Sequence, residues 1–415
     1  MSEAEPGPHA LEESRRLLSL AILPTLIAIG AVLDMDIFFA AVLGALLAAR
    51  AALAADRKAA RGLSAAVLLW VILLPFFHPS GGGFIDDAVL ALARCGMALG
   101  LNIIVGFAGL LDLGYVAFFA LGALSAGWLM SGFFADADVH IAVGPTIESL
   151  PGVHVNFLVV VVAAVVLCTA AGMLIGLPTL RLRGDYIGIV TLAFGEIIGR
   201  IIVNGDEIHL GDAKLTSGRR GITPIDKVDL PGLDRFGALD VRPWYWLALG
   251  LVVLALLVNF RLRDSRLGRA WIALREDEAT AASMGVPLVR TKLLAYGIGA
   301  AFGGMSGAFM ASFLNTVSAD QFQFSFSIFI LAMIVLGGLG SIWGVTVGAI
   351  TLSFVNDRLI PDVLNTVPSK VGLDLDLTEL SFGIFGFLLV IMMLLRPEGL
   401  FPERRRRLEL SASAR

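Results

Sequence analysis

Long apolar runs, separated by short polar segments, follow one another along most of the chain. About 20 consecutive apolar residues are enough for one helix to cross the hydrocarbon core of a bilayer. The pattern therefore predicts an all-α integral membrane protein, a polytopic helical bundle of about 10–12 transmembrane helices. The predicted spans cover residues 17–33, 37–55, 63–77, 88–108, 116–134, 155–177, 186–203, 244–260, 293–314, 326–339, 345–355 and 380–395.

The composition excludes a sizeable soluble domain. Of the 415 residues, 57% are hydrophobic and only 16% are charged. In a soluble domain about a quarter of the residues are charged. The low charge extends over the whole length of the chain. Cys95 and Cys168 both lie inside apolar runs, where we expect small core residues and no disulfide or metal framework.

The basic residues orient the predicted spans. With both termini inside, about two thirds of the 31 Lys and Arg fall on the cytoplasmic side, as the positive-inside rule requires. Loop 204–243 is then external. Loop 261–292 is cytoplasmic and contains seven Lys or Arg. It is long enough for one or two surface helices, which would offer a contact surface to a soluble partner.

Two glycine-rich segments, 105–123 and 335–349, each join two short apolar runs, one in each half of the chain. Paired breaks of this kind favour a substrate site near the membrane midplane in transporters. The alternative is that the glycines only allow close helix packing, which is our interpretation of Gly299, Gly303 and Gly307. We expect the breaks at 106–114 and 337–344 to flank a translocation path, with these candidate residues: Phe107, Gly109, Leu110, Asp112, Gly114, Gly337, Gly338 and Ser341.

Four ionisable residues lie within or at the edge of predicted spans: Arg94, Asp112, Glu196 and Arg200. A charge in the membrane needs a partner or a wet cavity. Glu196 and Arg200 have the i, i+4 spacing of an ion pair on one helix. We expect this pair in the bundle interior, where it either stabilises the bundle or lines the path.

Asp112 and Arg94 have less definite partners. Asp112 either caps a helix that begins near Tyr115 or contributes to the path. For Arg94 the candidate partners are Asp86, Asp87 and Asp112.

Several kinds of catalytic chemistry have no motif in this sequence. It contains no Gly-x-x-x-x-Gly-Lys-Ser/Thr phosphate loop, no His-Glu-x-x-His and no Gly-x-Ser-x-Gly. The five histidines fall in predicted loops or the tail and are not clustered along the sequence. We therefore expect no enzyme activity, no catalytic residues and no metal site.

Four motifs, in this order, resemble the branched-chain amino acid ABC transporter permease family and, more closely, its larger, M-type subunit. They are GLLDLGYVAFFALGA at 109–123, RLRGDYIGIVTLAFGEIIGR at 181–200, GRAWIALREDEA at 268–279 and VLGGLGS at 335–341. The resemblance covers residues 63–402. It implies a permease subunit that forms half of the translocation pore of an ATP-driven importer for branched-chain or other hydrophobic amino acids.

The resemblance also implies partners and a location. The partners are a second, related permease, two cytoplasmic ATPases, a periplasmic solute-binding protein, the amino-acid substrate and the lipid of a bacterial inner membrane, with no nucleic acid. The chain would hold no cofactor, because ATP is bound by the partner subunits.

The coupling segment is expected at residues 269–287. Residues 278–285 approximate the Glu-Ala-Ala-x-x-x-Gly element that docks on the ATPase in ABC permeases, but the Gly is displaced by one position and no Leu-Pro follows. Residues 215–222 are similar to the family's external Thr-Gly-Gly-x-x-Gly-Ile element, with Arg219 and Arg220 at usually uncharged positions. The expected contacts with the ATPase are Arg269, Arg275, Glu276, Asp277, Glu278 and Gly285.

These observations give a domain organisation and leave alternatives. Residues 1–62 form an N-terminal tail with extra membrane spans, 63–402 the permease domain, and 403–415 a basic cytoplasmic tail.

Import of urea or short amides is an alternative within the family. A self-contained secondary carrier, in which Glu196 and Asp112 bind H⁺ or Na⁺, is an alternative outside it. A non-transporting scaffold is disfavoured by the glycine-broken spans.

Overall fold

The computed structural model describes residues 71–72, 74–76, 83–143, 150–179, 186–210, 213–229, 236–237, 240–364, 380–395 and 399. The chain forms two compact units, Met1–Gly82 and Gly83–Arg415. Only short helical pieces, at 71–72 and 74–76, are described in the first unit. The predicted spans 17–33 and 37–55, most of 63–77, and the tail 403–415 lie outside the described residues. The domain boundaries at 62 and 402 therefore stay predictions.

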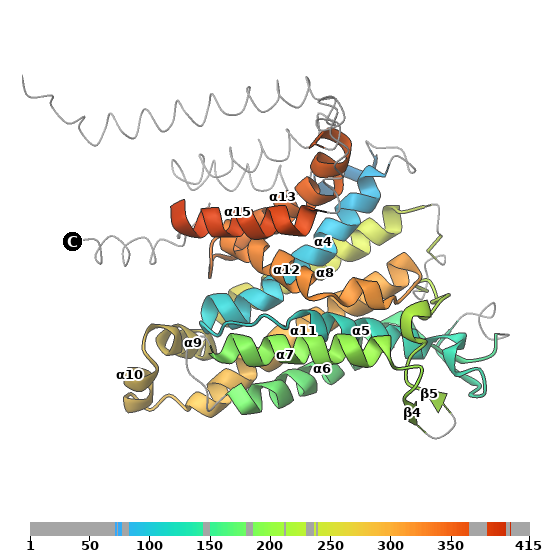
Figure 1. Ribbon diagram of the computed structural model, residues 1–415, viewed down its shortest axis with the longest axis horizontal. Coiled ribbons are helices and arrows are strands. Elements are labelled where there is room, and N and C mark those ends of the chain that lie inside the picture. The colour runs from blue at the N-terminus through green and yellow to red at the C-terminus, as the bar shows by residue number, and fades with distance from the viewer. Residues whose placement is uncertain are drawn as a thin grey trace, which may run out of the picture. The chain divides into compact units, whose positions relative to one another are not determined.

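The second unit is built almost entirely of helices (Figure 1). Its long helices are α4 (Phe84–Leu101), which continues as the π-helix η1 (Asn102–Phe107), α5 (Val116–Leu129), α6 (Phe157–Thr179), α7 (Tyr186–Val203), α8 (Arg242–Arg263), α11 (Leu288–Leu314), α12 (Phe324–Gly337), α13 (Ile342–Phe354) and α15 (Ser381–Leu395). Shorter elements are α9 (Arg266–Glu276), α10 (Glu278–Ser283), the π-helix η5 (Val355–Leu364), and the 3-10 turns η2 (Gly132–Phe134), η3 (Gly218–Arg220) and η4 (Ala319–Phe322).

The described strands are very short. β1 (Met130–Ser131), β3 (Val153–Val155) and β2 (Val139–Ile141) form one sheet in the order β1-β3-β2. β4 (His209–Leu210) pairs with β5 (Ala213–Lys214). In Figure 1, α9 and α10 lie at one end of the long helices and β4 and β5 at the other. We call these the α9 end and the strand end.

The predicted fold class, an all-α polytopic membrane protein, is confirmed. Five helical segments within the described residues are long and apolar enough to cross a membrane, namely Phe84–Phe107, Phe157–Pro178, Tyr186–Val203, Arg242–Arg263 and Leu288–Leu314. The predicted span 186–203 coincides with α7. The predicted span 345–355 is too short, because α13 begins at Ile342 and continues directly into η5.

Helix α11 forms the centre of the unit and packs against α4, α5 and α6. Glycine allows these close approaches, as the spacing of Gly299, Gly303 and Gly307 predicts. A β-carbon at Gly307 would collide with the backbone carbonyl of Phe119 in α5, and one at Gly299 would press on Ile104 in η1. Both cysteines are buried with free thiols, in the small-core role that we expect for them.

Candidate coupling and translocation site

The expected coupling segment folds into two helices with a sharp bend between them. Ser265 Oγ caps α9 by accepting from the Gly268 amide at 3.1 Å. Asp277 then leaves helical geometry, and its Oδ1 caps α10 by accepting from the Thr280 amide at 2.6 Å. This backbone hydrogen bond lowers the pKa of Asp277 below its ordinary value of 3.8. The cap on α10 is therefore fully formed at neutral pH and weakens as the pH falls through this lowered pKa.

Both helices of this segment are fastened to the first turns of α11. The indole of Trp271 is fully buried, and its Nε1 donates to the Thr291 carbonyl at 2.8 Å. Lys292 is 2% exposed, and its Nζ lies 2.7 Å from Oε1 of Glu278 in α10. We did not predict either anchor, although both residues were visible in the sequence. Trp271 is a tryptophan in a basic loop, and Lys292 is the last residue of that loop before the predicted span 293–314.

A third attachment joins α9 to the first glycine break. Arg275 Nη1 donates to the carbonyl oxygen of Gly106 at 2.7 Å. The side chain of Arg275 also lies close beside Gly109, which adopts a φ of +70° that glycine tolerates best. Arg275 therefore points into the bundle, whereas we expected it on the ATPase-facing surface.

The first break lies at the α9 end, which corrects our expectation of a midplane position for its Gly106–Gly109 part. The physical reason is helix length. α4 and η1 together span 24 residues, enough to cross a bilayer before the break begins. The other end of the break, at Gly114, packs against the backbone of Thr191 in α7.

Asp112 does not cap α5, so the first of our two alternatives for this residue is wrong, and its role in the path stays a prediction. Its Oδ1 accepts from the Gly114 amide at 2.9 Å, which forms a local turn inside the break. The first amide of α5, at Val116, donates instead to Ser327 Oγ of α12 at 3.0 Å. The acceptor for this first amide comes from a distant helix, and a local sequence pattern does not reveal such a partner.

The second break is a tight turn between α12 and α13. Gly338 adopts a φ of +119°, and Ser341 Oγ caps α13 by accepting from the Gly344 amide at 3.1 Å. Asn102 Oδ1 in η1 accepts from the Gly340 amide at 2.9 Å. Asn102 is completely buried and was absent from our predicted site.

Most of the path candidates are covered in this structure. Phe107, Leu110 and Asp112 are at most 5% exposed, and Gly114, Gly337 and Gly338 are buried. Of the candidates in the two breaks only Gly109 is exposed, and Ser341 is half-buried. In this conformation most residues of the two breaks pack against other parts of the protein and do not line an open channel.

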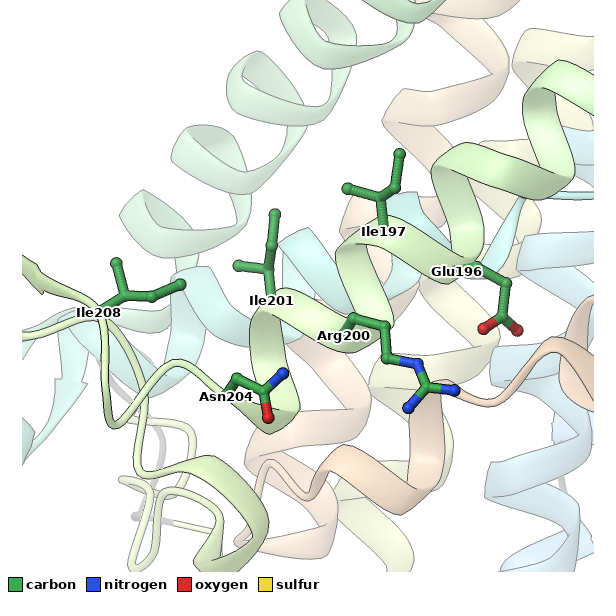
Figure 2. A pocket seen from close by; sticks show the side chains of 6 residues that line it. All are labelled: Glu196, Ile197, Arg200, Ile201, Asn204 and Ile208. Atoms are coloured by element: carbon green, nitrogen blue, oxygen red, sulfur yellow. The ribbon is translucent and has the colours of Figure 1, made fainter.

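Glu196 and Arg200 are both exposed on α7 in the single chain. Our expectation of a pair in the bundle interior is therefore wrong for the chain without partner subunits. Neither side chain takes part in an ion pair among the described residues. Figure 2 shows them along one side of α7, with Ile197 and Ile201 on the other. Together with Asn204 and Ile208 these residues line an open groove of about 360 Å³. α7 is apolar on most of its surface, so spacing alone did not indicate its buried face.

The other charge within a span, Arg94, pairs with Asp357 of η5, and none of the three predicted carboxylates is its partner. A second pair, Arg358 Nε with Asp87 Oδ2 at 2.8 Å, joins the same two elements. These pairs fasten η5 to α4 at its first turn, through Asp87, and near its middle, through Arg94.

Two histidines come together, although their sequence positions suggested no cluster. The β2–β3 register places His140 opposite His154, and their rings stack with centroids 5.4 Å apart. His154 Nδ1 lies 2.6 Å from Oδ2 of Asp226. Within the described ranges, no group of three or more His, Cys, Asp or Glu is arranged to hold a metal ion.

Sequence comparisons identify relatives of this chain. The family described as the branched-chain amino acid transport system / permease component matches residues 88–393. The high-affinity branched-chain amino acid transport system permease protein LivM of Escherichia coli K12 is 37% identical over 369 residues, which cover 84% of this chain and 76% of that protein. The probable branched-chain amino acid transport permease protein LivM of Methanocaldococcus jannaschii is 26% identical over 328 residues, covering 74% and 90%.

A shorter match extends to the LivH permease protein of the same transport system in Salmonella typhimurium. It is 30% identical over 155 residues, covering 37% of this chain and 45% of LivH. No solved structure matches the chain.

Proposed function

The chain belongs to the branched-chain amino acid transport system permease family, and we propose on that premise that it is the M-type permease subunit of an ATP-driven importer. It passes branched-chain or other hydrophobic amino acids across a bacterial inner membrane and forms half of the pore. The observation that carries the proposal furthest is the attachment of α9 and α10 to the bundle through Trp271, Glu278 and Arg275. A surface segment with three such anchors can pass a displacement on to the spans.

The ATPase partners bind the outer surface of α9 and α10. Arg269, Glu276, Asp277 and Gly285 are exposed there, where a second protein can reach them. Arg275 and Glu278 instead hold the segment to the bundle. Closure of two ATPases on ATP would displace α9, and its anchors would carry that displacement into η1 and α11. A shift between two states needs only a few kcal/mol of preferential partner binding.

The second permease covers the groove on α7. A charged side chain within a membrane span rarely faces lipid, because leaving water costs at least about 2.5–3.5 kcal/mol at the bilayer centre. Glu196 and Arg200 are exposed on a helix that is otherwise apolar. A related permease of the LivH type, or the water-filled path between the two subunits, would supply the polar surroundings that these side chains require.

The buried state of the breaks supports a gated path. Phe107 and Leu110 offer apolar surface to a hydrophobic side chain only after the break has moved away from its neighbours. Tight substrate binding is not required of this chain, because a periplasmic solute-binding protein can supply the affinity.

The proposal is tested by uptake in proteoliposomes that hold this chain, its LivH-type partner and two ATPases from the same organism. Radiolabelled leucine and a periplasmic solute-binding protein from the same organism are added outside. We expect uptake that needs internal ATP and persists when ionophores collapse every ion gradient. Uptake driven by a gradient without ATP would contradict the proposal and favour a secondary carrier. Preferential uptake of urea or acetamide would show that the substrate is a small amide and not a hydrophobic amino acid.

A further inference from the structure

Gly106 is the point where α9 and the two glycine breaks meet. Its carbonyl oxygen accepts from Arg275 of α9. A β-carbon at Gly106 would collide with the Asn102 side chain and lie 2.7 Å from the amide nitrogen of Gly340. No residue other than glycine fits this position without displacing one of the two neighbours. The coupling segment, the first break and the second break are therefore in contact at one place, although they are far apart in the sequence.

Asn102 completes this contact from within the π-helix. Its Oδ1 accepts from the Gly340 amide at 2.9 Å, which fixes the orientation of the side-chain amide because an N–H must meet an oxygen. The Nδ2 of Asn102 is buried and has no hydrogen-bond partner among the described residues. A buried donor without an acceptor destabilises a fold. An apolar residue would pack here without that cost, so the asparagine is better explained by its bond to the second break.

We propose that Arg275 and Asn102 are positioning residues that make both glycine breaks move together with α9. This inference deepens the proposed function, since it assigns the route by which an ATPase contact reaches the path. A displacement of α9 acts on the Gly106 carbonyl through Arg275. The one-turn π-helix η1 is the element most easily rearranged, because its wide turns are irregular and commonly occur at functional sites. Through Asn102 the same displacement reaches Gly340 and the turn between α12 and α13.

The contact geometry favours a joint movement over two independent ones. Asn102 and Gly106 lie in one six-residue element, so neither break can change without altering the surroundings of the other. Gly340 also has a positive φ, of +83°, and its turn contains Gly338. Both breaks thus have the backbone freedom to change conformation while their shared hydrogen bond keeps them in register.

The first experiment measures leucine uptake per ATP hydrolysed in the reconstituted complex. We expect Arg275→Met and Asn102→Ala each to lower this ratio by about tenfold, while ATP hydrolysis stays within about twofold of the wild type. The double variant should be no worse than the poorer single variant, because both interrupt one route. Arg275→Lys should restore part of the ratio, since an ammonium can still donate to the Gly106 carbonyl.

Asn259→Ala is the matched control. Asn259 is also fully buried, but its side-chain amide donates to the Ala255 carbonyl of its own helix at 2.9 Å. Its loss should leave uptake per ATP unchanged. An unchanged ratio in Arg275→Met and Asn102→Ala, multiplied effects in the double variant, or an equal loss in Asn259→Ala would overturn the inference.

A second experiment tests the linkage without transport and so separates it from the proposed function. In the purified full-length chain, Arg275→Met should speed hydrogen–deuterium exchange at the Gly340 amide, although the hydrogen bond that the substitution removes is to Gly106 of the first break. Unchanged exchange at Gly340 would overturn the linkage even if the complex imports leucine. Faster exchange, in a chain whose complex shows no ATP-driven uptake, would retain the linkage and refute the importer.

Discussion

Helices α11 and α6 pack side by side, but they differ in both hydropathy and burial. α6 has a higher mean hydropathy than α11, but only 28% of its apolar window is buried against 78% for α11. The more hydrophobic helix is therefore the more exposed one. α11 contains glycine, alanine and serine along much of its length, whereas α6 presents valine and leucine outward.

The difference shows what holds this bundle together. Lipid is as apolar as leucine, so burying a leucine in the bundle gains little, whereas small residues allow helix backbones to approach closely. Gly307 of α11 meets the backbone of α5, and Gly304 meets Cys168 of α6. Close packing in the centre and apolar side chains at the rim are two parts of one arrangement.

The largest effect that this comparison predicts is at the centre. Gly307→Leu would force a side chain into the backbone of α5 and should cost about 3 kcal/mol of stability through overpacking. Val162→Leu, at a 62% exposed position on α6, should stay within about 0.5 kcal/mol. Thermal unfolding of the two purified variants in the same detergent measures both. Equal transition temperatures would contradict the contrast between centre and rim.

A smaller, more local effect is predicted for the α9 anchor. Trp271→Ala removes a fully buried indole and its hydrogen bond, so it should loosen α9 locally while the centre of the bundle keeps its packing. Hydrogen–deuterium exchange should then rise throughout α9 and in the first turn of α11. Trp343→Ala is the control, because that indole is 59% exposed. Protection of α9 that survives Trp271→Ala would show that the segment is held elsewhere.

The smallest of these effects concerns the Glu278–Lys292 pair. Glu278→Ala leaves a buried ammonium without its partner and should cost about 2 kcal/mol, a value reduced because the Glu278 side chain is 34% exposed. Adding Lys292→Met should recover much of that loss, since no charge is then buried. A double variant that is less stable than Glu278→Ala would contradict the pairing. Denaturant unfolding in mixed micelles gives the comparison.

The sequence predicted the helices well because the length of an apolar run is a local property. The bounds of α7 coincide with the predicted span, and the bend at Asp277 falls inside the segment expected to bind the ATPase. The end of a helix is harder to predict. α4 begins at Phe84, before its predicted span at residue 88, because Asp86 and Asp87 belong to its first turn although both are charged.

The contacts between distant segments could not be predicted in the same way. The partner of Arg94 lies 263 positions away and that of Asn102 lies 238 positions away. A lone asparagine in an apolar run has no pattern that separates it from a surface residue. The i, i+4 spacing of Glu196 and Arg200 indicates that both lie on one side of a helix, but it does not indicate which side the neighbouring helices cover.

The central claim is that α9 and α10 bind an ATPase, and a disulfide cross-link tests it most directly. Ala279 is exposed on α10, so Ala279→Cys places a thiol on the proposed contact surface without touching the anchors. The complex is oxidised in membranes that retain leucine uptake, with single cysteines placed along the ATPase surface. We predict a cross-linked permease–ATPase band whose yield changes when ATP is added. No cross-link to either ATPase, in a complex that still transports, would contradict the account.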